Sequence, residues 1–151
     1  MSATSKEVFL KGVVSELKNE YPQWPIEDHF KLQWIGQPSD TWPEADIVID
    51  MPRRRVVINY DEDSDPVSSL TRYWPILHDQ GHVSLTIIQI WQRGKATGDG
   101  YATLARWTGM RLMELYPGTI YEFIEKTSEP AEVVTKKITN LIIDREKLSE
   151  D

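Results

Sequence analysis

The sequence predicts an α/β fold in which a mixed central β-sheet is flanked by helices. Two adjacent segments, "DIVIDM" and "RVVINY", have the β-branched composition and the alternation of strands, and a short turn joins them. Beyond them, strand-like and helix-like segments alternate, which is typical of a sheet with helices on both faces. Helical spacing of apolar residues near both ends adds a helix at each end, so the expected order is αβββαβαβα.

Length and composition narrow the class of protein. At 151 residues, with 40% hydrophobic and 27% charged residues, we expect a single domain over residues 1–151 with short, flexible termini. The lack of cysteine excludes disulfides, zinc–cysteine sites and thiol nucleophiles. No apolar run approaches the ~20 residues that cross a bilayer, and the start lacks a signal-peptide core, so we expect a cytoplasmic protein with no membrane partner.

Residues 6 to 21 are predicted to form the first helix, which "YPQWP" ends because each proline disfavours helical geometry in the residue before it. Its apolar positions recur at helical spacing: Val8, Phe9, Val13, Leu17 and Tyr21. From His29, "HFKLQWIGQ" is predicted to be a strand with Phe30, Leu32 and Trp34 on one face.

The second half of the chain alternates helices with strands. Asp65 and Pro66 predict the start of a helix, as N-cap and first-turn proline, and Pro75 is expected to kink or end it. "HVSLTIIQIWQ" is apolar nearly throughout, as in a central strand covered on both faces. After the connection "RGKATGDG", a helix is predicted because these residues follow helical spacing: Tyr101, Leu104, Thr108, Leu112 and Leu115.

Two further elements close the chain. "TIYEFIEK" alternates as a strand, and the segment from Glu129 to Leu148 is predicted to be an amphipathic helix. The helix is expected to turn these residues inward: Val134, Ile138, Leu141 and Ile142. Together with the earlier elements, they predict helices on both faces of the sheet.

The predicted hairpin gathers polar side chains at its open end. Alternation puts Asp46 on the face of Val48 in the first strand, and Asn59 and Asp61 on the face of Val57 in the second. If the register brings Asp46 opposite Asn59 and Asp61, two carboxylates and an amide meet at one point. Oxygen ligands of this kind suit Mg²⁺.

The acidic residues after the hairpin have a simpler explanation. Asp63 and Asp65 can cap the next helix, and negative charge, including that of Glu62, is favourable near its N-terminus. For Asp46 and Asp61 a purely structural role and a functional role both remain open, since sites tend to form at strand ends.

The element order and the hairpin, which reads "ADIVI" and then "RVVINYD", resemble the PD-(D/E)xK nuclease superfamily, whose fold is called restriction-endonuclease-like. In that family an acid opens the second strand, and the third carries an acid-x-lysine triplet. Asp46 matches the first acid, and the triplet falls on Asn59, Tyr60 and Asp61, starting 13 positions later (59 − 46 = 13). The resemblance covers nearly the whole chain and implies a Mg²⁺-dependent phosphodiesterase that cleaves nucleic acid, with the metal held by Asp46 and Asp61.

Two positions depart from the family pattern. Asn59 stands where an acid is expected and Asp61 where a lysine is expected, although some branches, such as those that resemble very-short-patch repair endonucleases, carry aspartate in the last place. Asparagine supplies no charge to hold the ion that would polarise the phosphate and activate water. A glutamate on the first helix often joins such sites, and the resemblance implies Glu20 or Glu16 in that role.

Two functional interpretations follow. In the first, the chain is a nuclease in which Asp46 and Asp61 hold Mg²⁺, Asn59 orients a water or phosphate, and Glu20 is an outer acid. In the second, the fold is retained without catalysis, in an interaction module that assembles with itself or with a larger nucleic-acid-processing or defence complex. Asn59 and the net charge of −7, which opposes attraction to a phosphate backbone, favour the second.

The remaining candidates concern binding. Five basic residues are candidate phosphate contacts if they converge, and solubilising residues if they do not: Arg53, Arg54, Arg55, Arg93 and Lys95. The histidines at positions 29, 78 and 82 are expected in surface or cap roles. The six tryptophans are expected mainly to pack, and with the apolar faces of the last two helices they offer a possible oligomer interface.

Overall fold

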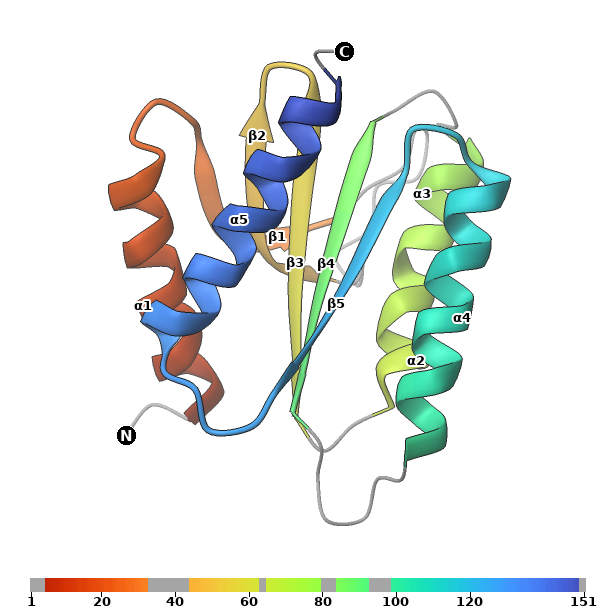
Figure 1. Ribbon diagram of the computed structural model, residues 1–151, viewed down its shortest axis with the longest axis horizontal. Helices are drawn as coiled ribbons and strands as arrows, with labels where there is room; N and C mark the ends of the chain where they lie inside the picture. Colours follow the sequence, from red (N-terminus) through yellow and green to blue (C-terminus); the bar gives the residue numbers. More distant parts are fainter. Residues whose placement is uncertain (1–4, 33–43, 63–64, 80–83, 93–98, 150–151) are drawn as a thin grey trace.

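A computed structural model confirms the α/β class, with a five-stranded mixed sheet flanked by helices (Figure 1). It describes residues 5–32, 44–62, 65–79, 84–92 and 99–149. The strands are β1 (Ile26–Lys31), β2 (Glu44–Met51), β3 (Arg54–Glu62), β4 (Leu85–Gln92) and β5 (Ile120–Lys126). The helices are α1 (Ser5–Glu20), α2 (Pro66–Leu70), α3 (Trp74–Asp79), α4 (Asp99–Leu115) and α5 (Ala131–Ser149), with a 3₁₀ turn over Thr71–Tyr73.

The strands lie in the order β1-β2-β3-β4-β5. The first three run antiparallel, and β4 and β5 are each parallel to the strand before them. Because β4 lies between two strands and under helices, all of its residues but the last are buried. Its near-continuous apolar sequence predicted this position.

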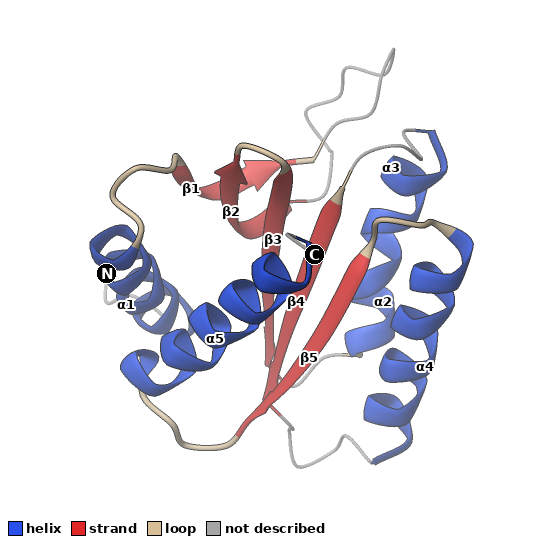
Figure 2. Ribbon diagram, turned by 45° about the horizontal axis from the view of Figure 1, so that its top comes forward, coloured by secondary structure: helices blue, strands red, loops and turns tan. Residues whose placement is uncertain are grey.

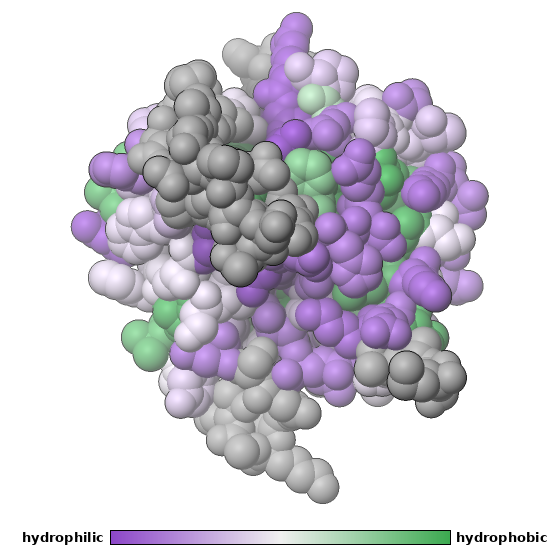
Figure 3. Space-filling view, turned by 180° about the vertical axis from the view of Figure 1, so that it is seen from behind, coloured by the Kyte–Doolittle hydropathy of each residue, from purple (hydrophilic) through white to green (hydrophobic). Residues whose placement is uncertain are grey.

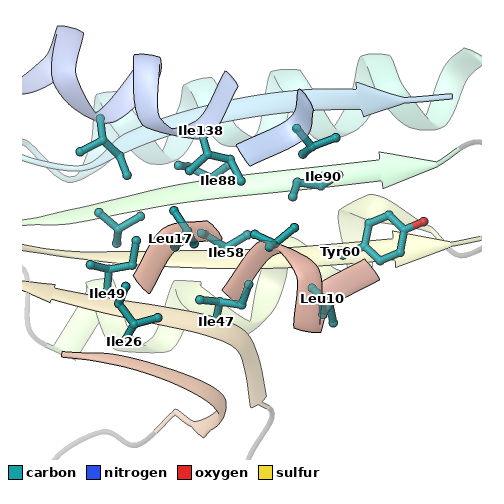
Figure 4. Packing of buried hydrophobic residues seen from close by; sticks show 14 of the residues in the cluster. Leu10, Leu17, Ile26, Ile47, Ile49, Ile58, Tyr60, Ile88, Ile90 and Ile138 are labelled. Carbon is teal, nitrogen blue, oxygen red and sulfur yellow. The ribbon is translucent and has the colours of Figure 1, made fainter. Parts of the chain in front are cut away.

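Helices cover both faces of the sheet, as both ribbon views show (Figure 2). On one face α1 and α5 pack against large aliphatic side chains, among them Ile47, Ile58 and Ile88 (Figure 4). On the other face α2, α3 and α4 pack against a second cluster that includes Val48, Val57 and Ile87. The alternating side chains of β2 and β3 therefore divide between two cores.

The segment after the hairpin begins as the sequence predicted. The Asp65 Oδ1 accepts a hydrogen bond of 2.9 Å from the Val67 backbone N–H, and Pro66 is the first residue of α2. The helix does not continue unbroken, since the 3₁₀ turn separates α2 from α3. Pro75 lies in the first turn of α3, where its missing N–H costs no helical hydrogen bond.

Helical spacing predicted α1 and α4, but not every apolar residue at that spacing is buried. Tyr101, Leu104 and Leu115 are exposed, and α4 buries Ala102, Ala105 and Gly109 beside Thr108 and Leu112. Val8 is also exposed, and Leu10 takes the inward place on α1. The first strand begins at Ile26, ahead of the expected His29, and Trp34 lies outside the described residues.

The final helix follows its prediction. Val134, Ile138 and Ile142 are buried in the α1–α5 core, and Leu141 packs against it. No helix in the described ranges is both long and apolar enough to span a membrane.

Candidate functional site

The hairpin register brings Asp46 to the end of β3. The ladder pairs Ile47 with Ile58, and beyond it the Asp46 carboxylate takes the place of a backbone partner. Its Oδ2 accepts a hydrogen bond of 2.7 Å from the Tyr60 N–H. One carboxylate oxygen therefore satisfies a strand N–H at the point where β2 and β3 separate.

Strict alternation predicted that Asp46 shares a face with Val48. The structure shows that it does not. Ala45 packs with Val48 in the core under α2 and α4, so β2 departs from alternation between Ala45 and Ile47. The Asp46 Oδ1 instead lies 3.4 Å from the Lys6 Nζ on α1. Asp46 also lines a cavity of about 450 Å³ between α1 and the region where the second half of β1 pairs with the start of β2.

Asn59 and Asp61 point to the opposite side, into the core under α2 and α4. Asn59 is only 2% exposed, and its Oδ1 has no hydrogen-bond partner among the described residues. Asp61 is 9% exposed and accepts a hydrogen bond of 3.4 Å from the Gln89 Nε2. Burial raises the pKa of Asp61, against the lowering effects of Ser69, Gln89, Arg72 and Lys6.

Gln89, on β4, organises the polar contacts around Asp61. Its Nε2 donates to the Pro66 carbonyl at 2.6 Å, and its Oε1 accepts from the Tyr121 hydroxyl at 2.7 Å. Burial raises the pKa of Tyr121, which keeps this hydroxyl protonated as a donor. These bonds join β4, β5 and the start of α2, so Asp61 belongs to an internal network that positions packed elements.

A second polar group lies at the same end of the sheet, on the α1 side. The Tyr60 hydroxyl lies 2.6 Å from the Glu62 Oε1 and 2.7 Å from the Gln92 Oε1. Lys126, at the end of β5, donates to the same Gln92 oxygen at 3.1 Å. Ser5 meets Glu62 at 3.4 Å, so consecutive residues of α1, Ser5 and Lys6, contact Glu62 and Asp46.

Lys126 is buried, and its ammonium group meets aromatic faces as well as the amide oxygen. Its Nζ lies 5.0 Å from the centre of the Phe9 ring and 5.8 Å from that of Tyr60. Within the described part of the chain, the Nζ has no carboxylate at ion-pair distance. Sequence reasoning missed Lys6, Gln92 and Lys126, and the available signal was that β4 and β5 end in polar residues beside the end of β3.

Glu20 does not join the site. It is the last residue of α1, whereas Asp46 contacts Lys6 in the first turn, about 21 Å away along a helix that rises 1.5 Å per residue. Glu20 and Glu16 line a small cavity of about 140 Å³ with residues of α5. The structure therefore places neither glutamate beside Asp46.

The predicted basic residues do not form one described surface. Arg54 donates to the Thr86 Oγ1 at 2.7 Å, and Arg55 pairs with Asp50 at 2.7 Å, while Arg53 lies exposed in the hairpin turn. Arg93 and Lys95 lie outside the described residues. Gln92, the residue before Arg93 in the chain, pairs with Glu62, at the opposite end of β3 from Arg54 and Arg55.

The histidines described by the structure contact neighbouring side chains. His29, whose backbone φ is 50°, has its Nδ1 3.4 Å from the Glu44 Oε2, and His78 meets the Tyr116 hydroxyl at 3.4 Å. His82 and Asp63 lie outside the described residues.

The predicted residues do not fit a Mg²⁺ site. Both Asp46 oxygens already have partners, and Asp61 is buried in the α2–α4 core, where it accepts a hydrogen bond from Gln89. Among the residues that the structure describes, no three aspartate, glutamate, histidine or cysteine side chains group closely enough to hold a metal ion.

Comparison with known proteins gives little further information. No protein-family model matches the chain, and no curated protein matches it. Among solved structures, the chain is similar to the crystal structure of AF1548, a protein of unknown function, with 12% identity and a TM-score of 0.37. The match covers 77% of this chain and spans 58% of AF1548, and a TM-score this low does not establish a shared fold.

Proposed function

We propose that this chain is a non-catalytic interaction module built on a restriction-endonuclease-like fold, which assembles with itself or with a larger nucleic-acid-processing or defence complex. Three antiparallel strands followed by two parallel ones, with Asp46 beside the end of β3, support the proposed fold. The same geometry argues against catalysis, because Asn59 and Asp61 are buried and both Asp46 oxygens have partners within the protein.

The observation that carries the proposal is that these side chains are buried in the protein or bound by its own groups. Asn59 and Asp61 lie in the α2–α4 core, at 2% and 9% exposure, whereas Asp46 faces Lys6 on α1. A phosphodiesterase needs its ligands and a water to reach one phosphate from one cleft. Asn59 and Asp61 are instead surrounded by packed protein, so their polar atoms do not face such a cleft.

Electrostatics agree with a role in protein assembly. The chain has a formal net charge of −7, and Arg54 and Arg55 have intramolecular partners. A nucleic-acid surface requires positive charge that is free to replace counterions on phosphates. Binding to a protein partner does not require free positive charge.

A cleavage assay tests this proposal. The purified chain is incubated with single- and double-stranded DNA and RNA in millimolar Mg²⁺ or Mn²⁺, beside Asp46→Asn and the matched control Asp50→Asn, which alters the carboxylate that pairs with Arg55. We expect no cleavage from any of the three proteins. Metal-dependent cleavage that Asp46→Asn abolishes and Asp50→Asn retains would show that the chain is an enzyme.

One observation favours nuclease activity as a second candidate. Two acids, Asp46 and Glu62, and two cations, Lys6 and Lys126, gather around the first turn of α1 and the ends of β3 and β5. A buried lysine with an uncharged hydrogen-bond partner is suited to meet an anion such as a phosphate. The same assay with Lys126→Met tests this candidate, and Lys137→Met, at a half-exposed lysine, is the control. If the chain is a nuclease, Lys126→Met should abolish cleavage and Lys137→Met should retain it.

A further inference from the structure

Helix α4 packs on the sheet mainly through small residues and exposes most of its large apolar ones. Its inner side presents Ala102, Ala105 and Gly109. A Cβ at Gly109 would lie 2.0 Å from the Tyr121 ring, so the helix backbone is pressed against β5. Beside Gly109 the inner side has no room for a large side chain, so most large apolar side chains of α4 lie outside, and Leu112 is the exception.

The exposed side chains form one surface, which we call the α4 outer face: Tyr101, Leu104, Trp107, Met110 and Leu115. Each is 43% to 60% exposed, and they make up most of the large apolar residues that are exposed in the described part of the chain. In the view from behind, the flank where α4 lies carries white and green side chains between smaller purple areas (Figure 3). A grouping of this kind on one helix marks an interaction surface.

We propose that the α4 outer face binds the same face of a second copy of this chain, with the two helices antiparallel about a two-fold axis near Trp107. The inference deepens the proposed function, on which it rests, because it names a partner for the interaction module. A two-fold contact requires a surface that complements itself under rotation.

The distribution of apolar residues meets that requirement. Tyr101 and Leu115 lie seven positions on either side of Thr108, so an antiparallel pair brings the Tyr101 end of one helix to the Leu115 end of the other. Leu104, Trp107, Arg111 and Leu115 recur at helical spacing along the stripe between the ends. The Trp107 side chains meet near the axis, and tryptophan is one of the residue types enriched in the hot spots near interface centres.

Charge permits a second copy at this face. Two chains of −7 repel one another over most of their surfaces. On the α4 outer face, however, Arg111 forms an ion pair with Glu114 and lies over the Trp107 ring, 5.8 Å from its centre. The flank of the face is therefore neutral, and two copies can approach without like charges meeting.

The area suits a weak dimer. Half-exposed side chains of this size leave on the order of 100 Å² each in water, so the five contribute roughly 500 Å². A standard interface buries about 800 Å² per partner, which neighbouring residues of α4 can complete. We expect dissociation in the micromolar range.

Sedimentation velocity over a range of concentrations tests the contact. Wild type should shift from monomer to dimer as the concentration rises, and Trp107→Glu should weaken the dimer at least about 30-fold. Val8→Glu is the matched control, because Val8 is as exposed as Trp107 but lies on α1. Circular dichroism checks that each variant is folded. A wild type that stays monomeric, or a dimer that Trp107→Glu leaves intact, would overturn the proposal.

Cysteine pairing tests the antiparallel arrangement, since the chain has no cysteine of its own. In the proposed dimer two copies of Tyr101→Cys lie about 21 Å apart along the helices, too far for a disulfide, and so do two copies of Leu115→Cys. A mixture of the two variants should form a mixed disulfide under mild oxidation, while each variant alone should not. Efficient pairing of either variant with itself would contradict the antiparallel arrangement.

These results are independent of the cleavage assay. A monomer that cleaves nothing overturns this inference and leaves the proposed lack of catalysis intact. A dimer that cleaves nucleic acid supports this inference and overturns the lack of catalysis.

Discussion

The two faces of the sheet are closed in different ways. On the α1–α5 side, large aliphatic residues fill the space between helix and strand, among them Leu17 and Ile138. On the α4 side, small residues such as Ala105 and Gly109 bring the helix close, and the interior holds the polar side chains of Asn59, Asp61 and Gln89. The environment of a polar residue on β3 therefore depends on the side it faces. On the α1–α5 side it lies near the end of the sheet, and on the α4 side it is buried.

A charge at position 59 gives the largest expected effect on this comparison. Asn59→Glu places a carboxylate where the present side chain is 2% exposed and where its Oδ1 lacks a partner among the described residues. An uncompensated buried charge costs about 3 to 5 kcal/mol, so we expect that loss in the free energy of unfolding, measured with urea at neutral pH.

Asn59→Leu provides the control for that change. It has a similar size and removes the unpaired oxygen, so stability should change by no more than about 1 kcal/mol. If Asn59→Glu were as stable as wild type and bound Mg²⁺, position 59 would be open to solvent and metal, and the α4 side would be a site.

The close approach of α4 to β5 predicts the next effect. Gly109→Ala forces the new methyl group against the Tyr121 ring, whose hydroxyl holds Gln89. Overpacking of this kind costs about 1 to 3 kcal/mol, and we expect the upper end in thermal or urea unfolding. Gly100→Ala, where a Cβ meets nothing within 4 Å, should change stability by less than about 0.5 kcal/mol. Equal effects at the two glycines would show that α4 is not pressed on the sheet.

Titration of Asp61 gives the smallest effect. Because burial raises its pKa, the folded protein holds the proton where the unfolded chain, with a pKa near the ordinary 3.8, has released it. The stability linked to this group is therefore full below the unfolded value and is lost as the pH rises through the folded value. Asp61→Asn removes that loss.

Urea unfolding from pH 3 to pH 7 checks this sign. The free energy of unfolding of Asp61→Asn, relative to wild type, should increase with pH. A relative stability that falls with pH would mean that Ser69, Gln89 and Arg72 stabilise the carboxylate more than burial penalises it. Asp50→Asn serves as the control, since Asp50 pairs with Arg55 and is only partly buried.

Local patterns in the sequence were sufficient for much of the fold. Alternation predicted the β2–β3 hairpin, the apolar run predicted the central β4, and Asp65 with Pro66 predicted the start of α2. Each of these depends on residues close together in the chain, where side-chain direction or backbone geometry decides the outcome.

The errors arose where distant elements decide the outcome. Helical spacing groups Leu104 with Leu112, yet Leu104 is exposed and Leu112 is buried, because the close approach of Gly109 to Tyr121 decides which side of α4 meets the sheet. Alternation placed Asp46 with Val48, and the separation of β2 from β3, where Asp46 binds the Tyr60 N–H, has no local signature. The α1-side contacts of Lys126 depend on β5 and β4 ending together, which follows from strand order.

The Tyr60 backbone amide offers the most direct test of the central claim, that the motif residues are structural and hold no metal. Its N–H donates to the Asp46 Oδ2, so any ion that captures Asp46 must disturb this hydrogen bond. In a titration of ¹⁵N-labelled protein with millimolar Mg²⁺, followed by NMR, we predict that the Tyr60 amide resonance moves no more than those of exposed loop residues. A saturable shift at Tyr60, lost in Asp46→Asn, would contradict the claim.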